Sequence, residues 1–347
     1  DAPIGYLASF KAYCSSAAGA KVGLTPTSFG DFMANEQPSA LSPQPCQREL
    51  HHFLGKDIVN FHGLFWPAML DGAGWRTPTS LHVNGYLTVN GEKMSKSRGT
   101  FVLARTYLDA GLDPDHLRYY FATMLTAAPV DLDLDLKAFE DRVNSHLVGK
   151  WVNLASRCAG IVHKSFDGRP ADSLPARERG LYDDSAKKLA ACAALYEACD
   201  FAGVTRLLVE VADEANAYVA GKAPWLLAKD ESKREELHVA CTLALNWFRL
   251  LSIWLQPIVP GIAQRAKAFL GGVWQRFEDA NEPSLGALLN EFVPLTTRID
   301  PKKIEAMTEA SKESLKPAPE GIAAVGGSPA EGPPAKEGGG LAADTDP

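Results

Sequence analysis

Residues 81–100 read LHVNGYLTVNGEKMSKSRGT, and this stretch decides how the chain around it folds. Apolar and β-branched residues alternate through its first half, which predicts strands, and the Asn-Gly pairs at positions 84 and 90 favour turns. The loop at residues 93–97 therefore projects from the end of a strand. Its lysines and hydroxyl groups suit the phosphates of a nucleotide, although the same composition also fits a solvated surface turn.

The pattern of apolar and polar residues changes twice along the chain, near residues 100 and 135. Residues 1–100 mix strand-like runs such as HHFLG with a helical stretch at residues 58–70, a pattern typical of α/β structure. Residues 101–135 predict a connector dominated by a helix that Asp113 caps and Pro114 opens. Residues 136–295 predict an all-α bundle, followed by a C-terminal peptide at residues 296–316. Residues 317–347 are rich in Pro, Gly, Ala and Glu, which predicts a disordered tail.

Composition sets the outer limits. The chain has 347 residues, 46% of them hydrophobic and 22% charged, which is enough for more than one core. No apolar run reaches the roughly 18 to 20 residues of a membrane helix, so we expect no membrane contact. A net charge of −7 disfavours a general nucleic-acid binder, so contact with a polyanion requires a local basic face. The six cysteines form no CxxC pair and no signal peptide opens the chain, which predicts a cytoplasmic location.

Several blocks of the sequence share one resemblance. KMSKS is the signature of class I aminoacyl-tRNA synthetases. DAPIGY, HFLGKDIVNFHGLFWPAML, LRYYF, WVNLASR and APWLLAK occur around it in the order found in methionyl-tRNA synthetases, which the chain resembles from residue 1 to about residue 312. The resemblance implies the second half of a class I Rossmann domain followed by an anticodon-binding helical bundle. It also implies ATP-dependent activation of L-methionine to methionyl-adenylate and transfer to tRNA(Met).

The resemblance implies where ATP binds. In HFLGKDIVNFH a strand enters a glycine turn and a helix starts near Asp57, which on the residues alone is either an N-cap or a nucleotide ligand. In the family, catalysis falls to Lys93 and Lys96, which with Mg²⁺ counter the charge on the leaving pyrophosphate. The implied ATP-binding residues are Gly55, Lys56, Asp57, Met94, Ser95, Lys96 and Ser97.

A methionine pocket is implied by the same resemblance. A histidine such as His62, four residues after Ile58 on a helix face, is most often a core residue. In the family, Pro3, Tyr6, Ile58 and His62 line the methionine side chain. Thioethers favour aromatic edges and apolar walls, and we expect His62 to donate a weak hydrogen bond to the sulfur.

The helical half offers a second site. Residues 136–164 predict a helix with one apolar side and one polar side, and the polar side is ordinarily a solvated face. Trp225, fixed by the preceding proline, is by itself as readily a core residue as a stacking platform. The resemblance implies that Asn153, Arg157, Pro224 and Trp225 read the CAU anticodon of tRNA(Met).

Departures from the family pattern limit these expectations. No His-x-Gly-His motif occurs, so we expect a carboxyl-terminal portion that lacks the phosphate-binding first half and is inactive alone. We expect no metal site, since Cys46 beside His51 and His52 lacks zinc spacing, and zinc would be possible only in the absent half. The alternative is a noncatalytic module that binds the tRNA anticodon. The residues do not indicate an oligomeric state.

Overall fold

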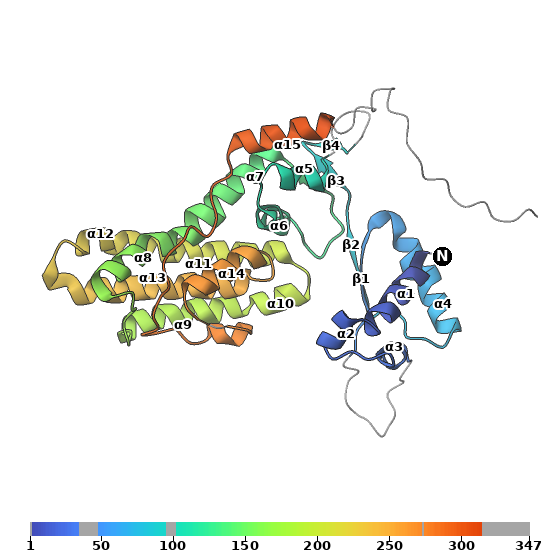
Figure 1. Ribbon diagram of the computed structural model, residues 1–347, viewed down its shortest axis with the longest axis horizontal. Helices are drawn as coiled ribbons and strands as arrows, with labels where there is room; N and C mark the ends of the chain where they lie inside the picture. The colour runs from blue at the N-terminus through green and yellow to red at the C-terminus, as the bar shows by residue number, and fades with distance from the viewer. Residues whose placement is uncertain (1, 35–47, 95–101, 273, 314–347) are drawn as a thin grey trace, which may run out of the picture.

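The chain forms an α/β part and a helical bundle joined by a small sheet (Figure 1). The computed structural model describes residues 2–34, 48–94, 102–272 and 274–313. The first part contains α1 (Ala2–Cys14), α2 (Ala17–Lys21), α3 (Ser28–Met33), β1 (His51–Gly55), α4 (Trp66–Gly72) and β2 (Ser80–Asn84). A 3₁₀ turn, η1 (Lys56–Ile58), and a π-helical turn, η2 (Phe61–Phe65), lie between β1 and α4.

β1 and β2 pair in parallel, with Phe53 opposite His82, and the helical segment from η1 to α4 crosses between them. The predicted strand HHFLG and the predicted helical stretch at residues 58–70 are therefore confirmed. A small core of Met33, Trp66 and Leu70 joins α3 to α4. Parallel sheets are normally covered on both faces. Here large apolar side chains are more than half exposed on β1, η2 and α4: Phe53, Phe61, Leu64, Phe65 and Met69.

A second sheet has the order β4-β3-β5, formed by β4 (Glu92–Lys93), β3 (Leu87–Val89) and β5 (Leu132–Leu134). β3 and β4 form the hairpin predicted at Asn90-Gly91, where Asn90 has φ 50° and Gly91 φ 76°. The Asn-Gly pair at position 84 makes no hairpin, because β2 and β3 lie in different sheets. The sequence reasoning also missed β5, which pairs parallel to β3.

The connector continues with α5 (Ala104–Asp109) and α6 (Pro114–Ala122). Asp113 caps α6 by accepting from the Asp115 amide at 3.0 Å, as predicted. α15 (Pro301–Glu313) returns from the end of the bundle and packs on α5, where the hydroxyl groups of Thr106 and Ser311 lie 2.6 Å apart (Figure 1). The connector and the C-terminal peptide therefore share one packed region.

The bundle begins with a continuous helix made of α7 (Leu136–Arg142), the π-helical η3 (Val143–Val152) and α8 (Asn153–Phe166). It confirms the helix predicted at residues 136–164, and the side predicted to be apolar buries Phe139, Val143, Leu147, Leu154 and Cys158. The remaining elements are α9 (Ala176–Ala190), α10 (Cys192–Glu197), α11 (Phe201–Lys222), α12 (Pro224–Leu227), η4 (Glu231–Lys233), α13 (Arg234–Leu255), α14 (Pro260–Phe269) and η5 (Phe277–Ala280).

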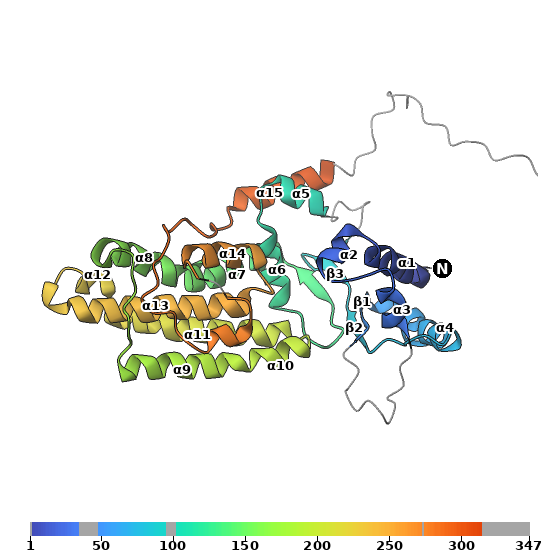
Figure 2. The same ribbon diagram turned by 60° about the horizontal axis from the view of Figure 1, so that its bottom comes forward.

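α13 lies at the centre of the bundle and packs against α8, α9, α11 and α14 (Figure 2). The segment Glu231–Leu255, which spans η4 and α13, is long and apolar enough to cross a membrane by composition. However, 83% of its apolar window is buried inside the bundle, so it is a core helix. The fold is therefore an α/β part followed by an all-α bundle, as predicted. The predicted disordered tail at residues 317–347 lies outside the described residues.

Candidate catalytic and anticodon-binding sites

Tyr6 and His62, two of the predicted methionine-binding residues, meet between α1 and η2. The Tyr6 hydroxyl lies 3.1 Å from His62 Nε2, and His62 Nδ1 lies 3.0 Å from the carbonyl oxygen of Ile58. Because a carbonyl only accepts, His62 Nδ1 donates to Ile58, whereas either Tyr6 or His62 can be the donor in the contact at Nε2. His62 is 5% exposed and both its nitrogens are occupied. The predicted hydrogen bond from His62 to a methionine sulfur stays a prediction, and it would require His62 to exchange one of these two partners.

His52 and Trp66 belong to the same cluster, and the sequence reasoning missed both. The His52 ring centroid lies 5.7 Å from that of Tyr6 and 5.6 Å from that of His62. The indole nitrogen of Trp66 donates to His52 Nε2 at 3.3 Å. Burial lowers the pKa of His52, and the neighbouring His62 lowers it further. Period-two alternation could have placed His52 on the inner face of β1, but it could not have identified its partners. The other two predicted residues are half-buried: Pro3 lies on α1 with Tyr6, and Ile58 precedes His62 by four residues.

The predicted nucleotide-binding turn lies at the carboxyl end of β1, where α/β sheets commonly bind ligands. A side chain at Gly55 would come within 2.7 Å of Asp57 Oδ1, so the Asp57 carboxylate would have to shift from its place over the turn. Asp57 is exposed and lies inside η1, whose N-cap is Gly55, so Asp57 is not the N-cap. Its carboxylate thus stands at the end of the strand without the capping role left open by the sequence.

Lys56 connects this turn to the segment before β5. Its ammonium group bonds to Asp131 Oδ1 at 2.6 Å and lies 4.2 Å from the ring centroid of Tyr86. The hydrogen bond from Lys56 holds the pKa of the Asp131 carboxyl below its usual range, assisted by the Tyr86 amide. The predicted ATP-binding Lys56 thus also joins the two sheets.

The KMSKS segment is described only in part. Lys93 is exposed at the end of β4, and Met94 is half-buried against the main core. Ser95, Lys96 and Ser97 lie outside the described residues, so their predicted contacts with ATP stay predictions. β4, the strand that leads into the loop, pairs with β3, and β3 pairs in turn with β5.

The predicted anticodon-binding residues come together at one end of the bundle. The Arg157 guanidinium carbon on α8 lies 5.4 Å from the ring centroid of Trp225 on α12. Trp225 is 43% exposed, so it is not a core residue and its ring is available for stacking. Ala223, at φ 45°, turns the chain sharply between α11 and α12, and the buried Pro224 opens α12. This turn holds the indole beside α8.

Asn153 is fixed by a residue that the sequence reasoning missed. Its side-chain amide donates to Asn216 Oδ1 at 3.2 Å, and Asn216 Nδ2 donates to the carbonyl oxygens of Lys150 and Ala212 at 2.9 and 2.7 Å. This chain of bonds orients the Asn153 amide and leaves its oxygen as an acceptor. Asn153, Ser156 and Arg157 also line a cavity of about 420 Å³.

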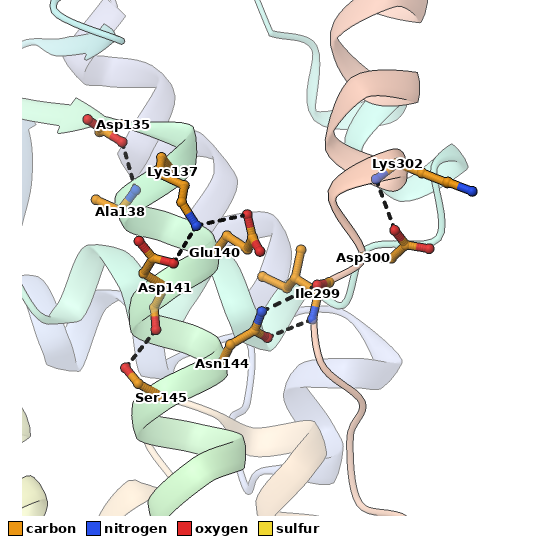
Figure 3. A network of polar contacts seen from close by, with 10 residues as sticks. All are labelled: Asp135, Lys137, Ala138, Glu140, Asp141, Asn144, Ser145, Ile299, Asp300 and Lys302. Atoms are coloured by element: carbon orange, nitrogen blue, oxygen red, sulfur yellow. Dashed lines mark hydrogen bonds and ion pairs between the residues drawn. The ribbon is translucent and has the colours of Figure 1, made fainter.

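The segment at residues 292–298, which leads into the C-terminal peptide, also lines this cavity through Phe292 and Arg298. It is attached to the same long helix by Asn144, whose amide donates to the carbonyl oxygen of Ile299 at 3.3 Å and accepts from the Ile299 amide at 2.7 Å (Figure 3). Asn144 therefore fixes the peptide next to the helix that carries Asn153 and Arg157.

Two family models match the two halves of this architecture. Residues 1–159 match the tRNA synthetases class I (M), which defines the chain as part of a class I aminoacyl-tRNA synthetase. Residues 170–298 match the anticodon binding domain of methionyl tRNA ligase.

Individual relatives agree with these matches. The methionine-tRNA ligases of Stenotrophomonas maltophilia (strain R551-3) and Xanthomonas oryzae pv. oryzae (strain PXO99A) are each 50% identical over 315 residues, which are 91% of this chain and 43% of each relative. Mycobacterium tuberculosis methionyl-tRNA synthetase in complex with methionyl-adenylate superposes with a TM-score of 0.66 at 25% identity, over 78% of this chain and 54% of that one. This chain belongs to the methionyl-tRNA synthetase family, and it spans less than half the length of these curated relatives.

Proposed function

We propose that this chain serves the methionine-tRNA ligase reaction, in which ATP activates L-methionine to methionyl-adenylate and the methionyl group passes to tRNA(Met). The observation that carries the proposal is the contact of Arg157 with an exposed Trp225, two residues far apart in the sequence. An aromatic face beside a guanidinium group and an oriented amide can stack and hydrogen-bond unpaired bases. We infer that these bases are the CAU anticodon.

The first chemical step of the proposed reaction takes place in the α/β part. A carboxylate oxygen of methionine forms a bond to the α-phosphorus of ATP, and the bond from that phosphorus to pyrophosphate breaks. Such transfers depend on positioning and on cations that offset the charge moving to the leaving group. We assign that role to Lys93 and Lys96. We propose that Asp57, at the end of β1, binds the ribose hydroxyl groups of ATP. The reaction needs no covalent intermediate with the protein.

Mg²⁺ is part of this proposal as a companion of ATP. Within residues 2–34, 48–94, 102–272 and 274–313, no group of three or more His, Cys, Asp or Glu residues is placed to hold a metal ion. Magnesium in nucleotide sites is held largely by phosphates and water. We propose that Mg²⁺ would enter together with ATP. We also propose a cytoplasmic location, where ATP and tRNA are available.

Binding of an anticodon stem-loop tests the tRNA half of the proposal. The purified chain is titrated with a labelled CAU stem-loop and with the same stem carrying a changed triplet. We expect the changed triplet to bind at least tenfold more weakly. Equal affinity for both stem-loops would contradict anticodon recognition.

A second candidate is a noncatalytic tRNA-binding module, because the contact of Arg157 with the exposed Trp225 serves base stacking whether or not the chain activates methionine. We propose that the 347-residue chain alone does not exchange pyrophosphate into ATP in the presence of methionine. Stem-loop binding without exchange is the expected result. Measurable exchange would show that this chain holds a complete activation site.

A further inference from the structure

A second cavity, of about 460 Å³, lies where the connector, α14 and the start of the C-terminal peptide meet. Its walls are the turn before α6, Arg265 of α14, the segment at residues 294–299 and Lys303 of α15. None of the residues assigned above to methionine, ATP or the anticodon is among its lining residues. The cavity is therefore separate from the sites already described.

Positive charge gathers around this cavity. Arg265, Arg298 and Lys303 line it, together with Asp113, which pairs with Arg265 at 2.8 Å. Lys303 donates to the carbonyl oxygen of Gly111 at 2.9 Å, and a carbonyl does not neutralise its charge. Within the described part of the chain, no hydrogen bond or ion pair is recorded for the Arg298 side chain. In a chain with a net charge of −7, such a local excess of cations favours an anionic ligand.

His116 adds a buried polar group to the cavity wall. It is 4% exposed, and its Nε2 lies 2.7 Å from Thr296 Oγ1, where either atom can be the donor. Its Nδ1 is buried and has no hydrogen-bond partner among the described residues. Folded proteins rarely leave such an atom unpaired unless water or a ligand pairs with it. Residues 296–298 form no helix or strand, so a small shift of this wall gives a ligand in the cavity access to Nδ1.

The charges that face His116 also favour an anion. Burial lowers the pKa of His116, Asp113 opposes this effect, and Arg265 and Lys303 lower the pKa further. The carboxylate of the neighbouring Asp115 accepts from a backbone amide of α14 at 2.6 Å. A bound anion would offset the repulsion between the two cations and the protonated ring, and it would therefore raise the pKa of His116.

We propose that this cavity binds a phosphate group, with Arg298 and Lys303 as its cationic ligands and His116 Nδ1–H as a further donor. The phosphate belongs to a free phosphorylated compound or to a nucleic-acid backbone. Its several acceptor oxygens suit guanidinium, ammonium and imidazole donors. A neutral His116 can carry its proton on Nδ1 when Thr296 donates to Nε2, and the doubly protonated ring donates from both nitrogens. Nδ1 can therefore donate in either charge state.

Inorganic phosphate is the probe for this site. The ¹⁵N-histidine-labelled chain is titrated with phosphate, and with chloride at matched ionic strength, and followed by nuclear magnetic resonance. We expect phosphate to shift the His116 resonances saturably and to raise the pKa of His116, because its Nδ1–H donates to the bound anion. No response of His116, or the same response to chloride, would overturn the phosphate site.

Lys303→Met tests the cationic wall. We expect it to weaken phosphate binding about three- to tenfold, as for the loss of one charged contact at a partly exposed site. Arg298 is less suitable because it also lines the anticodon cavity. The matched control is Lys302→Met, which removes the same charge from the preceding residue of α15, outside the lining residues, and should change the affinity less than about twofold. Equal losses in both variants would show general attraction by surface charge and would overturn the site.

A tRNA(Met) transcript distinguishes the two sources of phosphate. Once anisotropy shows that the transcript is bound, loss of the His116 response to phosphate would assign the site to the nucleic-acid backbone. A response that persists would assign it to a free phosphorylated compound. The affinity of Lys303→Met for the CAU stem-loop should equal that of the unaltered chain, so a failure of anticodon recognition and a failure of the phosphate site are observed separately.

Discussion

Replacing Trp225 by alanine should weaken CAU stem-loop binding without unfolding the bundle. The indole is 43% exposed, so one face is available for a base, and stacking on such a ring is worth about 1 to 3 kcal/mol. That energy corresponds to an increase in Kd of about five- to 150-fold. Within the protein, the ring loses its contact with Arg157, which at an exposed site is worth about 0.5 to 1 kcal/mol. The loss of stability should therefore be small.

The assay combines fluorescence anisotropy of a labelled stem-loop with thermal unfolding followed by circular dichroism. Leu226→Ala is the matched control, because Leu226 follows Trp225 on α12 and is 57% exposed. We expect the control to bind like the unaltered chain. Unchanged affinity of Trp225→Ala, or loss of the helical signal in that variant, would refute the assignment of the indole to base stacking.

Three further predictions follow from single contacts. Lys56 lowers the pKa of Asp131, so the pair stabilises the fold at pH values above the ordinary carboxyl pKa of about 3.9. This stabilisation disappears as the pH falls through the lower pKa of the folded state. Asp131→Asn should remove it, which unfolding measured across an acid titration will show. Asn144→Ala removes both bonds to Ile299, so amide hydrogen exchange in α15 should accelerate while CAU affinity stays within about twofold; unchanged exchange would contradict the anchoring role. Asp113→Ala removes the cap of α6 and should cost about 1 kcal/mol of unfolding free energy in urea titration, and a loss well below 0.5 kcal/mol would argue against a capping contribution.

Much of the fold followed from local pattern. Apolar residues at helical spacing predicted the long helix at residues 136–164, because Phe139, Val143 and Leu147 recur on the side that meets the bundle core. The Asn-Gly pair at position 90 predicted its hairpin through backbone preference alone. β5 was missed because a three-residue strand carries little periodicity and exists through its pairing with β3. The Asn-Gly pair at position 84, also expected to favour a turn, forms no hairpin because β2 and β3 lie in different sheets.

The candidate sites, like the fold, were predicted from the sequence only in part. The resemblance placed Asn153, Arg157 and Trp225 together, and the structure brings Arg157 and Trp225 into contact. It could not indicate Asn216, which orients Asn153 from another helix, because hydrogen-bond partners across a bundle depend on packing rather than spacing. His52 and Trp66 were missed for the same reason. The role of Lys96 stays a prediction, since that residue lies outside the described part of the chain.

The pairing of β3 limits where residues can be inserted into this chain or deleted from it. It pairs with β4, which ends at Lys93, and with β5, which leads through Asp135 into the helix carrying Asn153. One residue inserted between β5 and Asn153 would rotate the following helical side chains by about 100° around the axis. Asn153 would then turn away from Asn216, and Arg157 would turn away from Trp225. We therefore expect insertions and deletions in this family to avoid that helical run and to collect in the surface turns between the later helices.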